Sequence, residues 1–505
     1  MRVLSETLKA AMRDSHPAWA ASTAYAQYKT VVPLAVENGY HYICTTAGTS
    51  GGTEPTWSTT VGNTTNDGTA VWTNNGKRGD VLCKLVLTSG GTTKTYGVDT
   101  ANRLLRVSHS EQPYSQTARV LVENSDNVLT VLSLEGYTGV LSYGFATSAG
   151  DEYSPTAPLV VKAQELLSTG GKLVCQFDLI GLPDQLDSDK ALVSYSPLSD
   201  DPDECWTIVA AIAGATMSCY SHCTPIVTQF DSYDTLITSF KPKDSFRIRV
   251  GQSRLSAIRE LLGWTKCVMR FESDGKLHIS SPTVTGSTYD YEYNDTIPVA
   301  STYHTFFSKI YRRRLVLPNR YIVKNADDTE DVDVYYTGEA TSAASYALLP
   351  KTEPVILRLA SDAEAVLIAT ALIQRAELDQ ERGSGFAPMN VGQEVHDYVN
   401  ITDTRENDTR AGNIGYLTRE YEPGKFTFSF GFGDAKFLSS LGLEFGTQVA
   451  APTYADLKAL RLFLEAEILQ VAVAANVLAK AVLQLQDENT VPKLNTTKEL
   501  RIPVE

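Results

Sequence analysis

The residues best suited to chemistry in this chain are its thiols and imidazoles, and their spacing gives little sign of a reaction centre. The 505 residues include seven cysteines and seven histidines, and the only close group is Cys219, His222 and Cys223. A structural zinc site needs a second ligand pair, which the sequence does not supply at a matching spacing. We therefore interpret this group as small residues around a strand and a turn, and expect no metal and no cofactor.

Hydrolytic chemistry has no recognisable signature either. The sequence contains no H-E-x-x-H pair, no G-x-S-x-G elbow and no Cys–His nucleophile setting. Paired carboxylates that cleave glycosides are separated in space rather than by a fixed sequence interval, so a sequence leaves them open. We expect a protein that is not an enzyme, with a cell-wall hydrolase as the alternative.

Aromatic residues are concentrated in a block at residues 17–76. Trp19, Trp57 and Trp72 lie here between glycine-rich turns, and the block ends in N-D-G-T-A-V-W at 66–72. Aromatic rings can stack on the C–H faces of sugars, or they can form the core that so small a module needs. For any single ring we favour the core, because small β domains bury most of their aromatic side chains. If the module binds glycans, the candidate residues are Trp57, Trp72, Tyr25 and Tyr42.

Composition and charge describe an ordinary globular protein of several domains. Hydrophobic residues make up 43% and charged residues 20% of the chain, whose length suffices for three or four domains. A net charge of −15 argues against a general nucleic-acid binder and fits an acidic channel that repels passing DNA. Scattered cysteines indicate reduced thiols and assembly in a cytoplasm. Residues 1–12 lack the apolar core of a signal peptide and predict a short amphipathic helix.

One basic run stands out in this acidic chain. It comprises Lys309, Arg312, Arg313, Arg314, Arg320 and Lys324. A phosphate-contacting patch is one interpretation. We favour two strands, 310–316 and 320–323, whose basic side chains are solvated and pair with acidic neighbours. The carboxylates at 325–331 lack the Ca²⁺-loop pattern, so no metal is expected there.

Strand signals dominate the elements that would position these residues. Short runs of β-branched and aromatic residues recur at 81–87, 93–96, 104–109, 118–123 and 128–134. A three-strand meander is predicted at 394–401, 413–419 and 426–433, and the last strand alternates phenylalanine with small residues. Helices are predicted at 254–262, capped by Ser253, and at 361–382, opened by a capping box. The predicted fold class is mainly β (α+β), with barrel or sandwich domains and short helices.

The order of these motifs resembles a known family. The meander contains V-G-x-x-V-x-D-Y-V at 391–399, a charged loop, G-N-I-G-Y at 412–416 and an ending G-F-G at 431–433. This order resembles the closing β-domain of tailed-phage tail-hub proteins, which form the ring at the tip of the tail tube. A second resemblance is the helix followed by F-x-x-D-G-x-L-x-I at 271–279. The tryptophan block resembles carbohydrate-binding-type modules that recur in phage tail proteins.

The resemblance implies a division into six parts. These are an N-terminal helix at 1–16, an inserted Trp-rich β module at 17–78, a first hub β-domain at 79–205, an α+β hub domain at 206–290, a second hub β-domain at 291–446, and a C-terminal helix and tail at 447–505. An insertion is expected where both of its ends lie close together on an exposed loop.

A heptad-like seam runs along the predicted C-terminal helix. Its apolar positions are Leu457, Leu460, Leu464, Ile468, Val471, Ala475, Leu478, Val482 and Leu485. Such a seam permits a three-stranded bundle, and the alternative is a helix folded back onto its own β-domain. Polar residues interrupt the stretch, so a membrane span is not expected.

The resemblance implies a structural role at the tip of a phage tail. The protein would be a homotrimeric hub that closes the tail tube and takes part in host attachment and genome delivery, located in the virion after assembly in the host cytoplasm. Implied partners are the tail-tube or distal tail protein, tail fibres, the tape-measure protein and host cell-surface glycans, with DNA only as passing cargo. The alternative is a receptor-binding tail fibre or adhesin that recognises host surface glycans.

Overall fold

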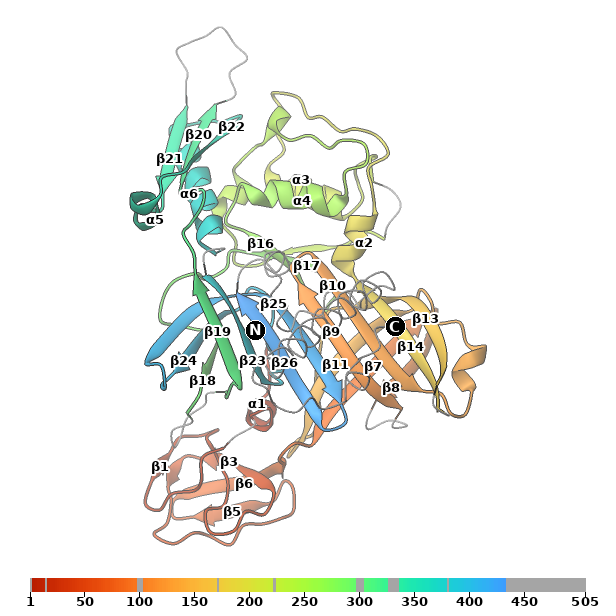
Figure 1. Ribbon diagram of the computed structural model, residues 1–505, viewed down its shortest axis with the longest axis vertical. Coiled ribbons are helices and arrows are strands. Elements are labelled where there is room, and N and C mark those ends of the chain that lie inside the picture. Colours follow the sequence, from red (N-terminus) through yellow and green to blue (C-terminus); the bar gives the residue numbers. More distant parts are fainter. Residues whose placement is uncertain are drawn as a thin grey trace, which may run out of the picture. The chain divides into compact units, whose positions relative to one another are not determined.

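The computed structural model describes residues 2–13, 16–97, 103–169, 172–220, 224–296, 304–325, 336–378 and 381–432 (Figure 1). The chain divides into two compact units, Met1–Thr447 and Gln448–Glu505, and every described residue belongs to the first. The predicted seam at Leu457–Leu485 lies outside the described residues, as do His222 and Cys223. The described unit is mainly β, so the predicted fold class is confirmed.

A small β module lies between helix α1 (Glu6–Ala11) and strand β7 (Val81–Ser89). Its sheet has the order β2-β3-β6-β5, formed by Thr30–Val31, Tyr40–Thr46, Ala70–Lys77 and Thr64–Asp67, and β1 (Ala24–Tyr25) pairs with β4 (Gly48–Thr49). The module has an aromatic core of its own. Its C-terminal end is fixed to the body, because Asn75 Nδ2 donates to Thr7 O (2.9 Å) and Ser148 Oγ donates to Asn75 Oδ1 (2.7 Å).

The main sheet contains fourteen strands from two parts of the chain. The first β unit comprises β7, β8 (Thr92–Gly97), β9 (Leu104–Gln112), β10 (Ser115–Glu123), β11 (Thr138–Thr147), β12 (Gly150–Pro155), β13 (Leu159–Thr169) and β14 (Lys172–Gly181). The second comprises β18 (Tyr291–Asn294), β19 (Ser308–Arg313), β23 (Glu381–Pro388), β24 (Tyr398–Asp403), β25 (Asp408–Glu422) and β26 (Lys425–Phe432). The main path is β19-β23-β26-β25-β9-β10-β14-β13-β11-β7-β8.

Strands β9 and β25 join the two β units into one sheet. They pair antiparallel from Leu417↔Glu111 to Tyr421↔Val107. Side chains of both units, together with Leu8 and Met12 at α1, form one hydrophobic core. Within β26 the predicted alternation is confirmed, because Phe428, Phe430 and Phe432 are buried in that core. The two β units therefore form one body with a shared interior.

A second core lies in an α+β part. Its elements are α2 (Leu182–Ser188), α3 (Cys205–Ala213), β15 (Thr228–Phe230), η2 (Thr235–Thr238), η3 (Lys243–Ser245), α4 (Arg254–Gly263), β16 (Val268–Phe271) and β17 (Leu277–Ser280). The part also contains β20 (Arg320–Asn325), β21 (Thr337–Thr341), α5 (Ala343–Leu348), β22 (Thr352–Leu357) and α6 (Asp362–Leu378). We expected residues 320–378 within the second β-domain. They belong here because Val323, Leu357 and Ile368 pack with the apolar faces of α3 and α4.

Local structure agrees with some predicted elements and departs from others. Ser253 Oγ accepts from Ser256 N (3.1 Å), as predicted for a helix cap, and Ser361 Oγ accepts from Glu364 N (3.2 Å) in the predicted capping box. The strand predicted at 128–134 is wrong: residues Val128–Val131 form the 3₁₀ turn η1. Asn124 explains the turn, since its Oδ1 accepts from Leu129 N (2.8 Å).

Among the described residues, we find no helix with the length and apolar character needed to cross a bilayer.

Candidate functional site

Three of the four candidate glycan-binding residues lie inside the module. Tyr25 is 2% exposed, and Tyr42 and Trp72 are fully buried. The Nε1 atoms of Trp19 and Trp72 both donate to one oxygen of the buried Asp67, at 2.7 and 3.0 Å. These rings present no free face to a sugar, so Tyr25, Tyr42 and Trp72 are corrected to core residues, in agreement with the core interpretation.

Trp57 is the candidate that lies at the surface. Its ring packs on Tyr42 with centroids 4.4 Å apart, and its Nε1 donates to Glu54 Oε1 (2.9 Å). The same carboxylate accepts from Leu34 N (2.6 Å) and Ala35 N (2.9 Å), which fixes the adjacent loop. Burial opposes this ionised state, but the hydrogen bonds from Trp57 and the two amides lower the pKa of Glu54. Among the four candidates, only Trp57 has a partly exposed side chain that could contact a sugar.

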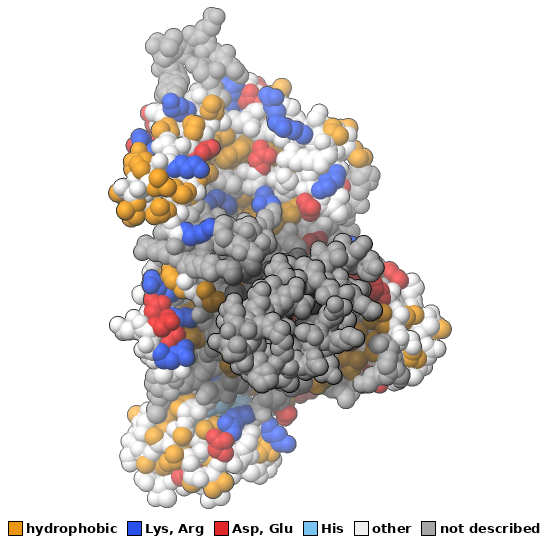
Figure 2. Space-filling model, viewed as in Figure 1, with side chains coloured by type: hydrophobic (Ala, Val, Ile, Leu, Met, Phe, Trp, Pro, Cys, Tyr) orange, Lys and Arg blue, Asp and Glu red, His pale blue; other side chains and the backbone are white. Residues whose placement is uncertain are grey.

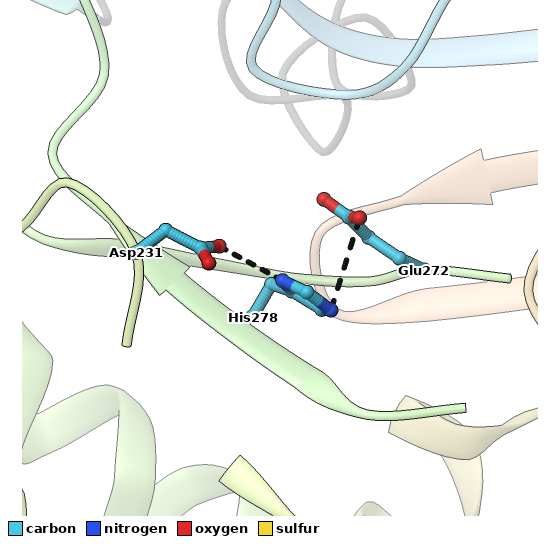
Figure 3. A group of neighbouring side chains, drawn as sticks. All are labelled: Asp231, Glu272 and His278. Carbon is cyan, nitrogen blue, oxygen red and sulfur yellow. Dashed lines mark hydrogen bonds and ion pairs between the residues drawn. The ribbon is translucent and has the colours of Figure 1, made fainter. Parts of the chain in front are cut away.

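A histidine between carboxylates lies at the β15-β17-β16 sheet (Figure 3). His278 Nδ1 lies 2.8 Å from Asp231 Oδ2, and Nε2 lies 3.2 Å from Asp274 Oδ1 and 3.7 Å from Glu272 Oε2. Burial favours the neutral ring, but the hydrogen bond to Asp231, the charge of Glu272 and the hydrogen bond to Asp274 outweigh it and raise the pKa of His278. The arrangement therefore favours a protonated imidazole.

The same geometry bears on metal binding. A metal ligand needs a free lone pair on one ring nitrogen. One donor atom each of Asp231, Glu272 and His278 lies within 4.8 Å of the other two, a spacing that an ion could bridge, whereas the ion pairs join Asp231 and Glu272 to different nitrogens of His278 (Figure 3). We interpret the cluster as an ion-pair link between the loop after β15 and the β16–β17 hairpin. Sequence analysis did not single it out, because Asp231 and His278 lie 47 residues apart.

A buried charge network joins the parts of the body at residues 389–397. Glu111 on β9 pairs with Arg419 on β25 (2.6 Å), and Arg2 lies 3.7 Å from Glu111 and 3.3 Å from Glu394. Arg270 on β16 reaches Glu394 (3.5 Å) and Asp397 (3.4 Å). The N-terminal segment, both β units and the α+β part therefore converge on this loop. We had predicted a strand from Glu394, but β24 begins at Tyr398.

Two carboxylates of this network have pKa values that shift in opposite directions. Burial alone would raise the pKa of Glu111, but the charges of Arg419 and Arg2 lower it to about 2. Burial raises the pKa of Asp397 to about 6, with Glu394 adding to the effect and Arg270 opposing it. The junction thus holds one firmly ionised carboxylate and one that titrates near neutral pH.

Two residues of the basic run, Lys309 and Arg320, have acidic partners in the structure. Lys309 lies near Asp408 (3.0 Å) and Glu406 (3.4 Å), and Arg320 pairs with Glu339. These contacts support paired charges over a phosphate-contacting patch, but Lys309 is paired in a buried position and is not solvated.

No protein-family model matches the chain, and a search of curated proteins finds no match. Solved structures to which the chain is similar include the tail protein from Neisseria meningitidis MC58, at 8% identity and a TM-score of 0.47 over 70% of this chain and 96% of that one. The 43 kDa tail protein of prophage MuSo2 from Shewanella oneidensis has 10% identity and a TM-score of 0.45, over 70% of this chain and 98% of that one. Prophage tail protein gp18 from Listeria monocytogenes EGD-e has 10% identity and a TM-score of 0.43, over 72% and 98%.

Proposed function

We propose that this chain is a structural component of a bacteriophage tail tip, a trimeric hub that closes the tail tube. The observation that carries the proposal is the pairing of β9 with β25, which fuses two β units into one sheet over one core. A single chain would thereby supply two segments of the wall of the tube, held in a fixed position relative to each other. Three copies would supply six, the number that a sixfold tube requires.

The motif order in the sequence supports the same role. The G-N-I-G-Y segment and the aromatic strand, which resemble the closing domain of tail hubs, lie in β25 and β26. Strand β25 is the one that pairs with β9. Arg270, which directly precedes the 271–279 motif of the second resemblance, contacts Asp397 in the loop at residues 389–397. The residues that carry the resemblance thus lie close to the contacts that join the two β units and the α+β part.

The side chains of the described residues favour a structural role over catalysis. The six described cysteines are buried, and burial raises the pKa of Cys44 and of Cys175 to about 11. A thiol that stays protonated is a poor nucleophile. We therefore propose that the protein acts by assembly with neighbouring tail proteins in the virion and takes part in host attachment and genome delivery without a reaction of its own.

A receptor-binding fibre or adhesin is the second candidate. The observation that favours it is the module surface, where Trp57 adjoins the exposed Leu34 and Val36 on a loop that Glu54 fixes. A rigid apolar surface with an aromatic ring suits a sugar or a protein partner.

Imaging of particles that carry a label on this chain separates the two candidates. The hub predicts label density on the tube axis at the tail tip. Density on appendages that project away from the axis would contradict the hub and favour the fibre. Binding to a glycan array by wild-type chain, lost in Trp57→Ala, would add the attachment role to either position.

A further inference from the structure

Four exposed leucines cluster beside helix α5. Leu315, Leu317, Leu348 and Leu349 are 38%, 44%, 74% and 52% exposed, and Figure 2 shows a dense group of hydrophobic side chains over α5. We name these four side chains the leucine knob. Exposed aliphatic groups gathered at one place mark a partner surface.

Hydrogen bonds hold the leucine knob in a defined shape. Val316 N donates to Ser345 Oγ (3.0 Å), which ties the segment before β20 to α5. The buried Asn319 donates from Nδ2 to Leu349 O (2.8 Å) and accepts from Lys351 N (2.8 Å). The backbone on both sides of the knob is therefore fixed by a polar clamp, and a partner would meet a prepared surface.

The charges around the leucine knob are mainly positive. Arg314, Arg320 and Lys351 border it in the sequence, and Arg320 pairs with Glu339. An apolar centre with a basic rim fits a partner surface that is apolar and acidic.

The first β unit carries a surface of that kind. Val131 is 83% exposed, and Val128, Leu166 and Leu173 are 37–48% exposed. Asn124 N donates to Leu173 O (2.9 Å), and Gln164 Nε2 donates to Leu129 O (3.0 Å), so η1 lies directly on the end of the β13–β14 hairpin. Glu123, Asp126 and Glu135 flank these side chains, and Asp126 pairs with Arg103. We name this surface the acidic tip.

The two surfaces belong to different parts of the chain. The acidic tip lies on η1 and on β13 and β14, over the sheet core. The leucine knob lies on α5 and the segment before β20, in the part built on the α+β core. Strand β13 is separated from β19 by six strands along the sheet path. Two complementary surfaces at separate places are the requirement for a head-to-tail contact between identical chains.

We infer that the leucine knob of one copy binds the acidic tip of the next copy. The leucines and valines form the dry centre of the contact, and the basic and acidic rims set its orientation. A head-to-tail contact closes into a ring when its rotation divides the circle. The inference deepens the proposed function, since it rests on the trimeric ring and names the surfaces that would form it.

Single substitutions at the two surfaces test the contact in the full-length chain. Leu348→Asp places a carboxylate against the acidic tip, and Val131→Lys places an ammonium group against the basic rim. Both side chains are mostly exposed, so each variant should keep the melting profile of the wild type. Sedimentation should show each variant alone as monomer, with self-association weakened at least tenfold.

Mixing the two variants tests the polarity of the contact. The Val131→Lys chain keeps an intact knob and the Leu348→Asp chain keeps an intact tip, so an equimolar mixture should form complexes that contain both chains. Native mass spectrometry with one chain isotope-labelled detects them. A knob-to-knob or tip-to-tip contact would instead let one of the two variants assemble alone as the wild type does, which would overturn the inference.

Two exposed positions elsewhere serve as matched controls. Leu198→Asp and Val250→Lys change side chains that are 71% and 67% exposed and lie outside both surfaces, and both should assemble as the wild type does. Rising salt should weaken the wild-type association, because the rims are charged. A wild-type trimer that salt and both surface variants leave intact contradicts the knob–tip contact and leaves the proposed ring standing. A wild-type chain that is monomeric throughout contradicts both.

Discussion

Asp67 organises the module through one buried carboxylate. Its Oδ2 accepts from Trp19 and Trp72, and its Oδ1 accepts from Gly51 N (2.7 Å). Asp67→Ala leaves these buried donors without partners, and an unsatisfied buried group costs about 1–3 kcal/mol. We expect the module to unfold in a separate, earlier calorimetric transition, destabilised by about 3 kcal/mol.

Matched variants separate this effect from a general loss of charge. Asp67→Asn keeps an acceptor and should cost less than Asp67→Ala. Glu37→Ala removes an exposed partner of Arg78 and should change stability by about 1 kcal/mol or less. Equal melting profiles for Asp67→Ala and Glu37→Ala would show that Asp67 does not hold the core.

Asp397 gives the junction a pH dependence of known sign. Its pKa is raised from 3.8 to about 6 by burial, so the folded state binds the proton more tightly than the unfolded state. The stabilisation from that proton is complete below pH 3.8 and is lost as the pH rises through about 6. Relative to Asp397→Asn, wild-type chain should lose stability between pH 4.5 and 7.5, by about 2 kcal/mol.

Comparing the wild-type chain with Asp397→Asn isolates the contribution of the Asp397 carboxyl group to stability. His278 titrates in both chains and cancels in the difference, and the contribution of Glu111 changes only as the pH falls towards 2. Urea unfolding at several pH values measures the difference. A difference that stays constant across this window would mean that Asp397 is ionised in the folded state.

For single residues, the sequence allowed a core or a surface role to be predicted from the residue type, but it did not show which side chains would be in contact. The preference for a core role of Tyr42 and Trp72 follows from the small size of the module, and their burial agrees with it. The shared acceptor Asp67 and the Asp231–His278 pair depend on contacts between segments 48 and 47 residues apart. No local spacing indicates such contacts.

The module should be separable from the body. It has its own core, and Asn75 joins its C-terminal end to the body by hydrogen bonds with Thr7 and Ser148. We expect that replacing residues 18–75 by a short Gly/Ser link leaves a soluble protein with the oligomeric state of the full chain. The measurement is sedimentation together with circular dichroism. Aggregation or loss of the β signal of the body would show that the module is part of the folding core.

Elements with a local cause could be predicted, and those with a distant cause could not. The alternation at Phe428, Phe430 and Phe432 and the caps at Ser253 and Ser361 follow from nearest neighbours. The pairing of β9 with β25 joins segments about 300 residues apart, and the grouping of α6 with α3 and α4 depends on which apolar faces fit. The turn η1 was missed because the side chain of Asn124 overrides the strand propensity of Val128–Val131.

In the whole molecule, two β units share one sheet, and in the proposed hub this sheet would supply two neighbouring positions of the ring. The junction loop at 389–397 fixes the β units and the α+β part through Arg2, Arg270 and Arg419. The predicted helical seam at Leu457–Leu485 would add a bundle on the ring axis, and this stays a prediction.

The most direct test of the central claim is a symmetry-averaged electron-microscopy reconstruction of the purified full-length protein under conditions where it assembles. The proposed hub predicts a closed ring of three 55.1 kDa chains. The wall of the ring should show six β segments around a central opening, and the paired strands β9 and β25 should lie within each chain. Isolated monomers at every concentration, or an elongated particle without a central opening, would contradict it.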